Sequence, residues 1–287
     1  MRAPKGRHDK EGTNSKKPMT QLYWQVYLNL ERDFLSIADT IHINDKQQEV
    51  YSMKIADLLI RTAVEIEALA KELYLANDGE VKEDKKMFFD SVCLKHLNKL
   101  WELEQKVVMV VSPAIYFEKE ENKVLKPLYM ADKRGPNSSD WKDAYQAIKH
   151  NRVNDLSKGS IKHLLHGLAA LYVLNLYYRN ESIKNMSLDD LTRVNPSFGS
   201  SLFAVKIHKL IDPKVDGPYQ KRCDYDQCVY IEDYEQRSKK NTMKSTSAMR
   251  KKCNDLLSDV DPKLPELILE CFRVLLRYDI VLNKQQY

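Results

Sequence analysis

Hydrophobic residues recur every three or four positions through most of the first 180 residues, the spacing at which they share one face of an α-helix. This pattern predicts helices at about 19–40, 46–76 and 85–105. A further helix is expected at about 140–152, followed by a strongly apolar one at about 160–178. Because the last helix is apolar on nearly every side, we expect it at the centre of a bundle.

The hydrophobic period changes between residues 106 and 129, where β-branched and aromatic residues dominate. The runs 106–112 and 123–129 flank a polar turn and predict a small β-hairpin, which Pro113 and Pro127 confine to a sheet edge or make irregular.

Beyond residue 180 the pattern weakens. Short strands are expected at 201–210 and 228–233, and two closing helices at 234–258 and 264–282. The fold class is therefore mainly α: a helical bundle with a small β-hairpin and a mixed α/β C-terminal extension. We expect three parts, a mobile basic arm (1–18), the bundle (19–180) and the extension (181–287).

Composition narrows the class of protein. With 287 residues, 43% of them hydrophobic and 30% charged, the chain can bury a core, which excludes a disordered protein. No apolar run approaches the roughly 20 residues that span a bilayer, and the N-terminal stretch has no apolar signal-peptide centre. Five scattered cysteines argue against a disulfide framework. We expect a cytoplasmic protein without a membrane partner.

Charge permits a polyanionic partner without demanding one, because the net charge of +5 is modest and spread along the chain. Two pairs of residues have the spacing of metal ligands, but Cys223 with Cys228 lacks a second Cys/His pair at zinc-finger spacing, and His163 with His166 lacks an acidic partner at a neighbouring helical position. No metal or cofactor is expected.

The run from Trp141 to Arg152 carries the strongest chemical pattern of the chain. It gathers an imidazole, ammonium groups, a guanidinium and two aromatic rings within about four helical turns, and Ser138-Ser139-Asp140 provides a helix start. Such groups can bind a phosphate. In a regular helix His150 and Arg152 point in nearly opposite directions, so both reach one phosphate only if the helix ends or bends near Asn151, or if a second protomer completes the site.

A candidate site follows from these residue types. His150 would act as general base or acid, while Arg152 and Lys149 would stabilise phosphate charge. On the preceding long helix Asp57, Arg61 and Glu65 are four residues apart; Arg61 and Glu65 either belong to a surface ion-pair ladder or face the His150 helix and orient its cations.

The remaining members of the candidate site are Tyr145, Trp141 and Asn151, which are expected to contact substrate. Tyr145 would pack beneath or stack on a base. The alternative is structural: Tyr145 is a core contact, Trp141 anchors the helix start, and His150 is an interior histidine bonded to a carboxylate or carbonyl.

The pattern Trp141-x-x-Ala-Tyr-x-x-Ile-Lys-His-x-Arg152, followed by Ala169-Ala-Leu-Tyr-Val-Leu174, resembles bacterial proteins with a Tyr-Asn-x-x-Lys-His-x-Arg signature and, more distantly, the HEPN helical domains. The segment 61–67 resembles the long helix before that signature, so the similarity covers about 46–178. Gln146 stands in place of the signature's asparagine, and His150 precedes Arg152, whereas the HEPN catalytic pattern places the arginine first.

The resemblance implies a helical bundle that forms a homodimer and acts as a metal-independent endoribonuclease in a phage-defence or toxin–antitoxin system, with RNA and an antitoxin-like protein as partners. The alternative is a non-catalytic binding or assembly module whose Lys-His-x-Arg cluster is a structural polar network. A nucleotide-binding protein is not supported, because Lys133-Arg-Gly-Pro136 is too short for a phosphate-binding loop.

Overall fold

The computed structural model describes residues 21–81, 86–180, 195–209, 224–233 and 279–284. The protein is mainly helical with small sheets of two and three strands, as the sequence predicts. The expected basic arm and most of the two closing helices lie outside the described residues. No helix within the described ranges combines the length and apolarity needed to cross a bilayer.

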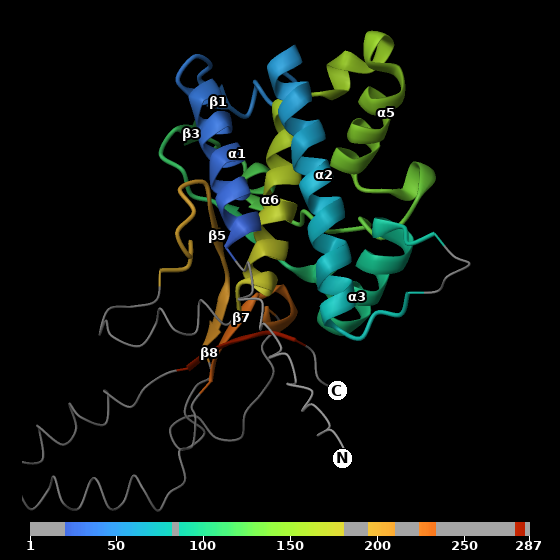
Figure 1. Cartoon of the computed structure of the whole chain (residues 1–287). Coiled ribbons are helices and arrows are strands. Elements are labelled where there is room, and N and C mark those ends of the chain that lie inside the picture. Colours follow the sequence, from blue (N-terminus) through green and yellow to red (C-terminus); the bar gives the residue numbers. More distant parts are fainter. Residues whose placement is uncertain (1–20, 82–85, 181–194, 210–223, 234–278, 285–287) are drawn as a thin grey trace, which may run out of the picture.

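Four long helices form the bundle: α1 (Leu22–Ala38), α2 (Met53–Ala76), α5 (Asp140–Asp155) and α6 (Ile161–Tyr178). In Figure 1, α6 lies between α1 and α2, and α5 lies on the far side of α2. The apolar helix α6 contacts the other three and buries nearly every residue from Leu164 to Tyr177, which confirms the central position expected from its sequence.

Helix α2 begins later than its hydrophobic pattern suggested. Its first residue is Met53, because the Ser52 hydroxyl caps the helix by accepting a hydrogen bond from the Ile55 N–H at 3.2 Å. The expected start near residue 46 is therefore wrong, and the chain before the cap contains β1 (Ile43–Asn44), which pairs in parallel with β3 (Ile115–Tyr116).

The expected third helix is divided into three pieces. A π-helical segment, η1 (Phe89–Leu94), leads into α3 (Lys95–Trp101). Glu102 then adopts the left-handed conformation at φ 46°, and a short 3-10 helix, η2 (Leu103–Gln105), follows. Within η1 the side chain of Asp90 lies in the interior, where it is 7% exposed.

The expected hairpin is present and gains a third strand. β2 (Val108–Val110) pairs antiparallel with β4 (Val124–Leu125), and the short helix α4 (Glu120–Lys123) precedes β4. On its other edge β2 pairs with β5 (Phe203–Val205). The first described part of the C-terminal extension is thus integrated into the sheet of the bundle.

A second three-stranded sheet consists of β6 (Ile207–Lys209), β7 (Tyr230–Asp233) and β8 (Asp279–Leu282). β6 and β7 confirm the strands expected there. β8 corrects the end of the expected last helix, because Ile280, Val281 and Leu282 pair antiparallel with β7, and β-branched residues favour a strand.

The buried carboxylate of Glu31 attaches the extension to α1. It accepts hydrogen bonds from the Tyr27 hydroxyl at 2.9 Å, from the Leu202 N–H at 2.9 Å and from the Ser200 hydroxyl. A buried carboxylate with several donors is stabilised in place. The chain entering β5 is therefore fixed to the bundle by polar contacts as well as by strand pairing.

Candidate functional site

Helix α5 is interrupted at Asn151, whose φ of −147° and ψ of 61° lie outside the helical region. The break separates two different environments. Before it, Trp141, Lys142, Tyr145 and Ile148 are buried; residues 149–154 around it are exposed. A bend near Asn151 was one of the ways in which the sequence allowed His150 and Arg152 to share a site, and the helix is interrupted at that residue. Short 3-10 segments flank the helix, η3 (Gly135–Asn137) before it and η4 (Leu156–Lys158) after it.

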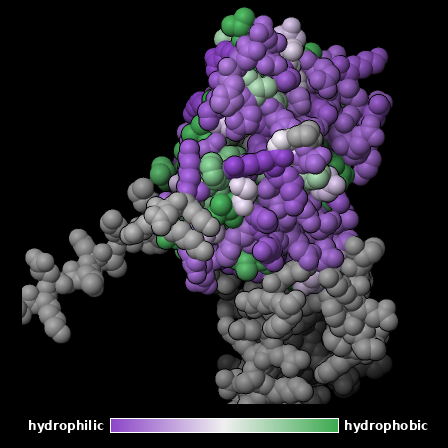
Figure 2. Space-filling view, turned by 90° about the vertical axis from the view of Figure 1, so that its right-hand side faces the viewer, coloured by the Kyte–Doolittle hydropathy of each residue, from purple (hydrophilic) through white to green (hydrophobic). Residues whose placement is uncertain are grey.

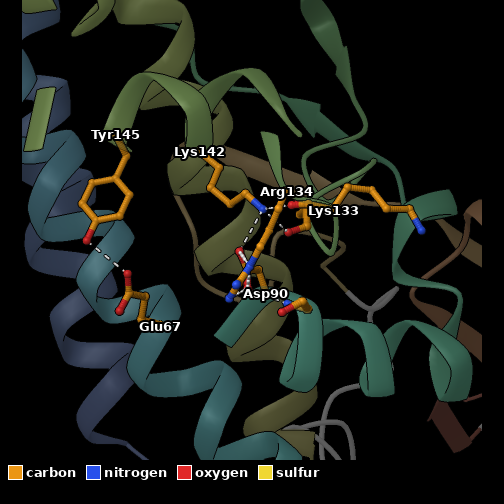
Figure 3. A network of polar contacts seen from close by, with 8 residues as sticks. Glu67, Asp90, Lys133, Arg134, Lys142 and Tyr145 are labelled. Carbon is orange, nitrogen blue, oxygen red and sulfur yellow. Dashed lines mark hydrogen bonds and ion pairs between the residues drawn. The ribbon is translucent and has the colours of Figure 1, made fainter. Parts of the chain in front are cut away.

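The two aromatic rings belong to the buried half. Trp141 is 1% exposed, and its indole N–H donates to the Pro127 carbonyl at 2.9 Å. Tyr145 is also 1% exposed, and its hydroxyl donates to the Glu67 carboxylate of α2 at 3.1 Å (Figure 3). Neither ring is available for stacking on a base, so the expectation that they contact substrate is wrong; large rings gain more from burial in the core.

Lys149 links the buried half to the surface. Its ammonium donates to the Tyr145 hydroxyl at 3.1 Å. This hydrogen bond is the main reason that the pKa of Lys149 is raised, and burial is the main reason that the pKa of Tyr145 is raised. Lys149 therefore remains charged, with its ammonium held over one end of a buried polar chain.

The exposed half carries His150 and Arg152. Within the described part of the chain, the His150 side chain is exposed and makes no hydrogen bond, ion pair or ring contact. Arg152 forms an ion pair with Asp57 of α2, with Nη1 2.9 Å from Oδ1. The Asn151 side chain accepts a hydrogen bond from Asn154 at 3.1 Å, which closes the irregular turn. The structure places these residues on one exposed turn.

Arg61 and Glu65 lie on the other side of α2. Arg61 pairs with Asp33 of α1 at 3.6 Å. Glu65 is close enough to Tyr23 of α1 to help raise the pKa of that tyrosine, after the larger effect of burial. Both residues thus face α1 and not α5, and the expectation that they orient the His150 cluster is wrong. The expected ladder along α2 is replaced by ion pairs between helices.

A polar network at the start of α5 was not predicted from the sequence (Figure 3). Lys142 is 3% exposed, and its ammonium donates to the Asp90 carboxylate at 3.4 Å, to the Ala131 carbonyl at 3.0 Å and to the Lys133 carbonyl. Arg134 approaches the same carboxylate with Nε and Nη2 at 2.8–3.1 Å. One buried carboxylate therefore holds two cations.

The charges of this network are mutually stabilised. Burial would raise the pKa of Asp90, but hydrogen bonds from Arg134 and the Ser91 N–H, with the charges of Lys142 and Arg134, lower it overall. Burial lowers the pKa of Lys142 despite the opposing effect of Asp90. Sequence offered one indication: Lys142 precedes Tyr145 by three residues on the buried face. Asp90 is too distant in the chain for any local pattern to reveal the pairing.

Within the described ranges, the two histidines of α6 are not joined by a third metal-ligating side chain. His163 Nδ1 lies 2.7 Å from the Lys158 carbonyl oxygen, and burial lowers the pKa of His166 to about 4. Among the residues that the structure describes, no three His, Cys, Asp or Glu side chains gather as metal ligands. Of the cysteine pair that was the other candidate metal site, Cys223 lies outside those residues.

Comparison of the chain with protein-family models, curated proteins and solved structures found no significant match. The HEPN resemblance therefore stays a prediction from the residues that carry it.

Proposed function

We propose that the protein binds RNA at the exposed half of α5 and cleaves it without a metal ion. The observation that carries this proposal is the break at Asn151, which leaves His150 and Arg152 on one exposed turn. In a regular helix residues two positions apart differ by about 200° in direction. The break removes that restriction, so that imidazole and guanidinium can approach one phosphate.

The residue types match the chemistry of RNA cleavage. The imidazole of His150 takes the proton from a ribose 2′-hydroxyl, whose oxygen attacks the adjacent phosphorus. Arg152 and Lys149 stabilise the negative charge that develops on the phosphate oxygens. The bond to the 5′-oxygen breaks and that oxygen takes a proton from water, while the imidazolium of His150 returns its proton to solvent. The products are a 2′,3′-cyclic phosphate and a 5′-hydroxyl, so neither a metal nor a cofactor is needed.

The surface around α5 supports a polar ligand. Figure 2 shows the side of the molecule on which α5 lies, and this face is mostly hydrophilic with scattered hydrophobic residues. Stable protein interfaces usually have an apolar centre. The phosphate-rich backbone of RNA fits such a face better than an apolar protein partner does. A homodimer and an antitoxin-like partner remain predictions from the HEPN resemblance.

The second candidate function is a non-catalytic binding or assembly module. It is favoured by the chain of hydrogen bonds from Glu67 through Tyr145 to Lys149, because that chain gives part of the Lys-His-x-Arg pattern a structural role. The ammonium of Lys142 likewise contacts groups of the protein itself, the Asp90 carboxylate and the Ala131 carbonyl. His150 distinguishes the two candidates, since it belongs to neither network.

The test is cleavage of end-labelled single-stranded RNA by the purified full chain in the presence of a chelator. We expect products with cyclic-phosphate ends, and their loss in His150→Ala. His42→Ala is the matched control, because His42 is also exposed but lies beside Tyr116 of β3, away from α5. Arg152→Gln should reduce cleavage by at least about tenfold, the scale of losing one group that stabilises transition-state charge.

The outcomes separate the two functions. Cleavage by wild type and His42→Ala but not by His150→Ala supports the ribonuclease. Equal cleavage by all three removes His150 from the mechanism. If wild type neither binds nor cleaves RNA and Tyr145→Phe, which removes the hydroxyl that joins Glu67 to Lys149, lowers the melting temperature, the structural module is the better account.

A further inference from the structure

An exposed aromatic ring lies among cations near the N-terminal end of α5. Phe88, the residue before η1, is 37% exposed. The guanidinium carbon of Arg134 lies 3.9 Å from the centroid of its ring, and the ammonium nitrogen of Lys86 lies 5.5 Å from it. We call Lys86, Phe88, Lys133 and Arg134 the Phe88 cluster. Core packing does not account for it, since all four side chains reach the surface.

Buried residues hold in place the guanidinium of Arg134, which lies over the Phe88 ring. Asp90 binds the guanidinium of Arg134 through both oxygens, and the buried ammonium of Lys142 holds Asp90. Arg134 is still 47% exposed. A side chain that is already ordered loses little conformational entropy when it binds a ligand. The stacked ring and guanidinium are thus preorganised, unlike a typical surface arginine.

The charge of the cluster favours an anion. Its exposed cationic groups are Lys86, Lys133 and Arg134, whereas Asp132 and Asp90, the carboxylates that pair with Lys133 and Arg134, are buried. In Figure 3 the ammonium of Lys133 points away from the pair of Arg134 and Asp90, and it lies 3.6 Å from the Asp132 carboxylate. The Lys133 carbonyl accepts a hydrogen bond from Lys142. Aromatic rings with nearby cations are the groups by which proteins bind single-stranded nucleic acids, because a base stacks on the ring or guanidinium and phosphates contact the cations.

We propose that the Phe88 cluster is a second contact for single-stranded RNA, in which one base stacks on Phe88 and Arg134 while Lys86 and Lys133 bind the neighbouring phosphates. The inference rests on the proposed function and adds a substrate class, because a base in a duplex is already stacked between its neighbours and is not free to stack on a protein side chain. The helix from Asp140 to Asn151 separates the cluster from the His150 turn by about 16 Å at 1.5 Å per residue. A strand that uses both contacts must follow α5.

The test is the affinity of the full chain for a fluorescent oligouridylate of about 12 nucleotides, within the known range of single-strand site sizes. Phe88→Ala should weaken binding by about tenfold, because base stacking on an aromatic ring contributes about 1–3 kcal/mol. Tyr116→Ala is the matched control: Tyr116 is a 53% exposed aromatic residue that stacks on His42, remote from α5. Lys133→Gln tests the phosphate contact without removing an aromatic ring.

Each result decides one point. Weaker binding by Phe88→Ala and Lys133→Gln, with Tyr116→Ala unchanged, supports the second contact. If Arg152→Gln weakens binding while Phe88→Ala matches Tyr116→Ala, the proposed function stands and the second contact is overturned. If Phe88→Ala weakens binding and Arg152→Gln does not, the cluster is a binding site and the His150 turn is not. Absence of RNA binding by wild type overturns both.

Phe88→Leu, which keeps an apolar side chain but removes the ring, should reproduce the loss of affinity seen in Phe88→Ala. Unchanged binding in Phe88→Leu contradicts stacking.

Discussion

The two halves of α5 place similar residues in opposite environments. Lys142 and Lys149 are seven residues apart on the same helix, yet Lys142 is 3% exposed with its ammonium among a carboxylate and two carbonyls, whereas Lys149 is exposed and donates to one hydroxyl. A buried lysine must be paired and hydrogen-bonded to remain charged. The first half therefore holds the fold together, and the second is available for a ligand.

The largest expected effect comes from Asp90→Ala, which leaves the ammonium of Lys142 buried without a counter-charge. Removing one partner of a buried ion pair costs about 3–5 kcal/mol. We expect the free energy of unfolding, measured by denaturant titration, to fall by that order. Asp33→Ala is the control, because the pair of Asp33 with Arg61 is exposed and should contribute less than about 1 kcal/mol.

Equal losses from Asp90→Ala and Asp33→Ala would contradict the division of α5 into a structural and an exposed half. A second replacement sharpens the test. Lys142→Met removes the buried charge and keeps a side chain of similar length, and it leaves Asp90 paired with Arg134. It should therefore cost less than Asp90→Ala, because a well-packed apolar group can replace a buried charge at little loss.

A smaller loss of stability is expected at low pH. The pKa of Asp90 in the folded protein is lowered from its ordinary value of 3.8, so Asp90 contributes stability that is fully present above that value. The contribution is lost as the pH falls through the lowered pKa, because the unfolded chain then binds the proton more readily. Denaturant titrations at a series of pH values should show less acid destabilisation in Asp90→Asn than in wild type. Parallel curves would show that the Asp90 carboxylate is not specifically stabilised.

Much of the bundle could be predicted from the sequence, because the period of hydrophobic residues depends only on neighbours in the chain. The central position of α6 and the β2–β4 pairing were predicted correctly. The start of α2 was not, since the cap of Ser52 competes with a helical pattern that extends further. The π-helical turn that buries Asp90 has no reliable local pattern either.

The candidate site was predictable in part for the same reason. From helical geometry, His150 and Arg152 could share a site only if the helix ended or bent near Asn151 or if a second protomer completed the site, and the structure has a break at Asn151. Which face of α2 meets α5 depends on how the helices pack, so Arg61 and Glu65 were assigned to the wrong side. The contact of Arg134 with Asp90 joins segments 44 residues apart and could not be found from spacing.

The smallest expected effect is a change in RNA affinity on replacing Asp57. The Asp57 carboxylate pairs with the guanidinium of Arg152, where a phosphate of RNA would bind. Their ion pair is exposed, with Asp57 56% and Arg152 41% accessible, so breaking it requires little free energy. Asp57→Asn should strengthen RNA binding by about two- to fivefold, since a carboxylate that competes for Arg152 and repels phosphate is removed.

Asp33→Asn is the matched control for that change, because Asp33 pairs with Arg61 on the α1 side of α2. Both variants raise the net charge by one, so a general electrostatic effect would increase the affinity of both equally. A larger increase for Asp57→Asn, measured by fluorescence anisotropy at two salt concentrations, locates the phosphate contact at Arg152. Equal increases would mean that the affinity for RNA depends only on the total charge of the protein. The proposal of a specific RNA site on the exposed half of α5 would then be wrong.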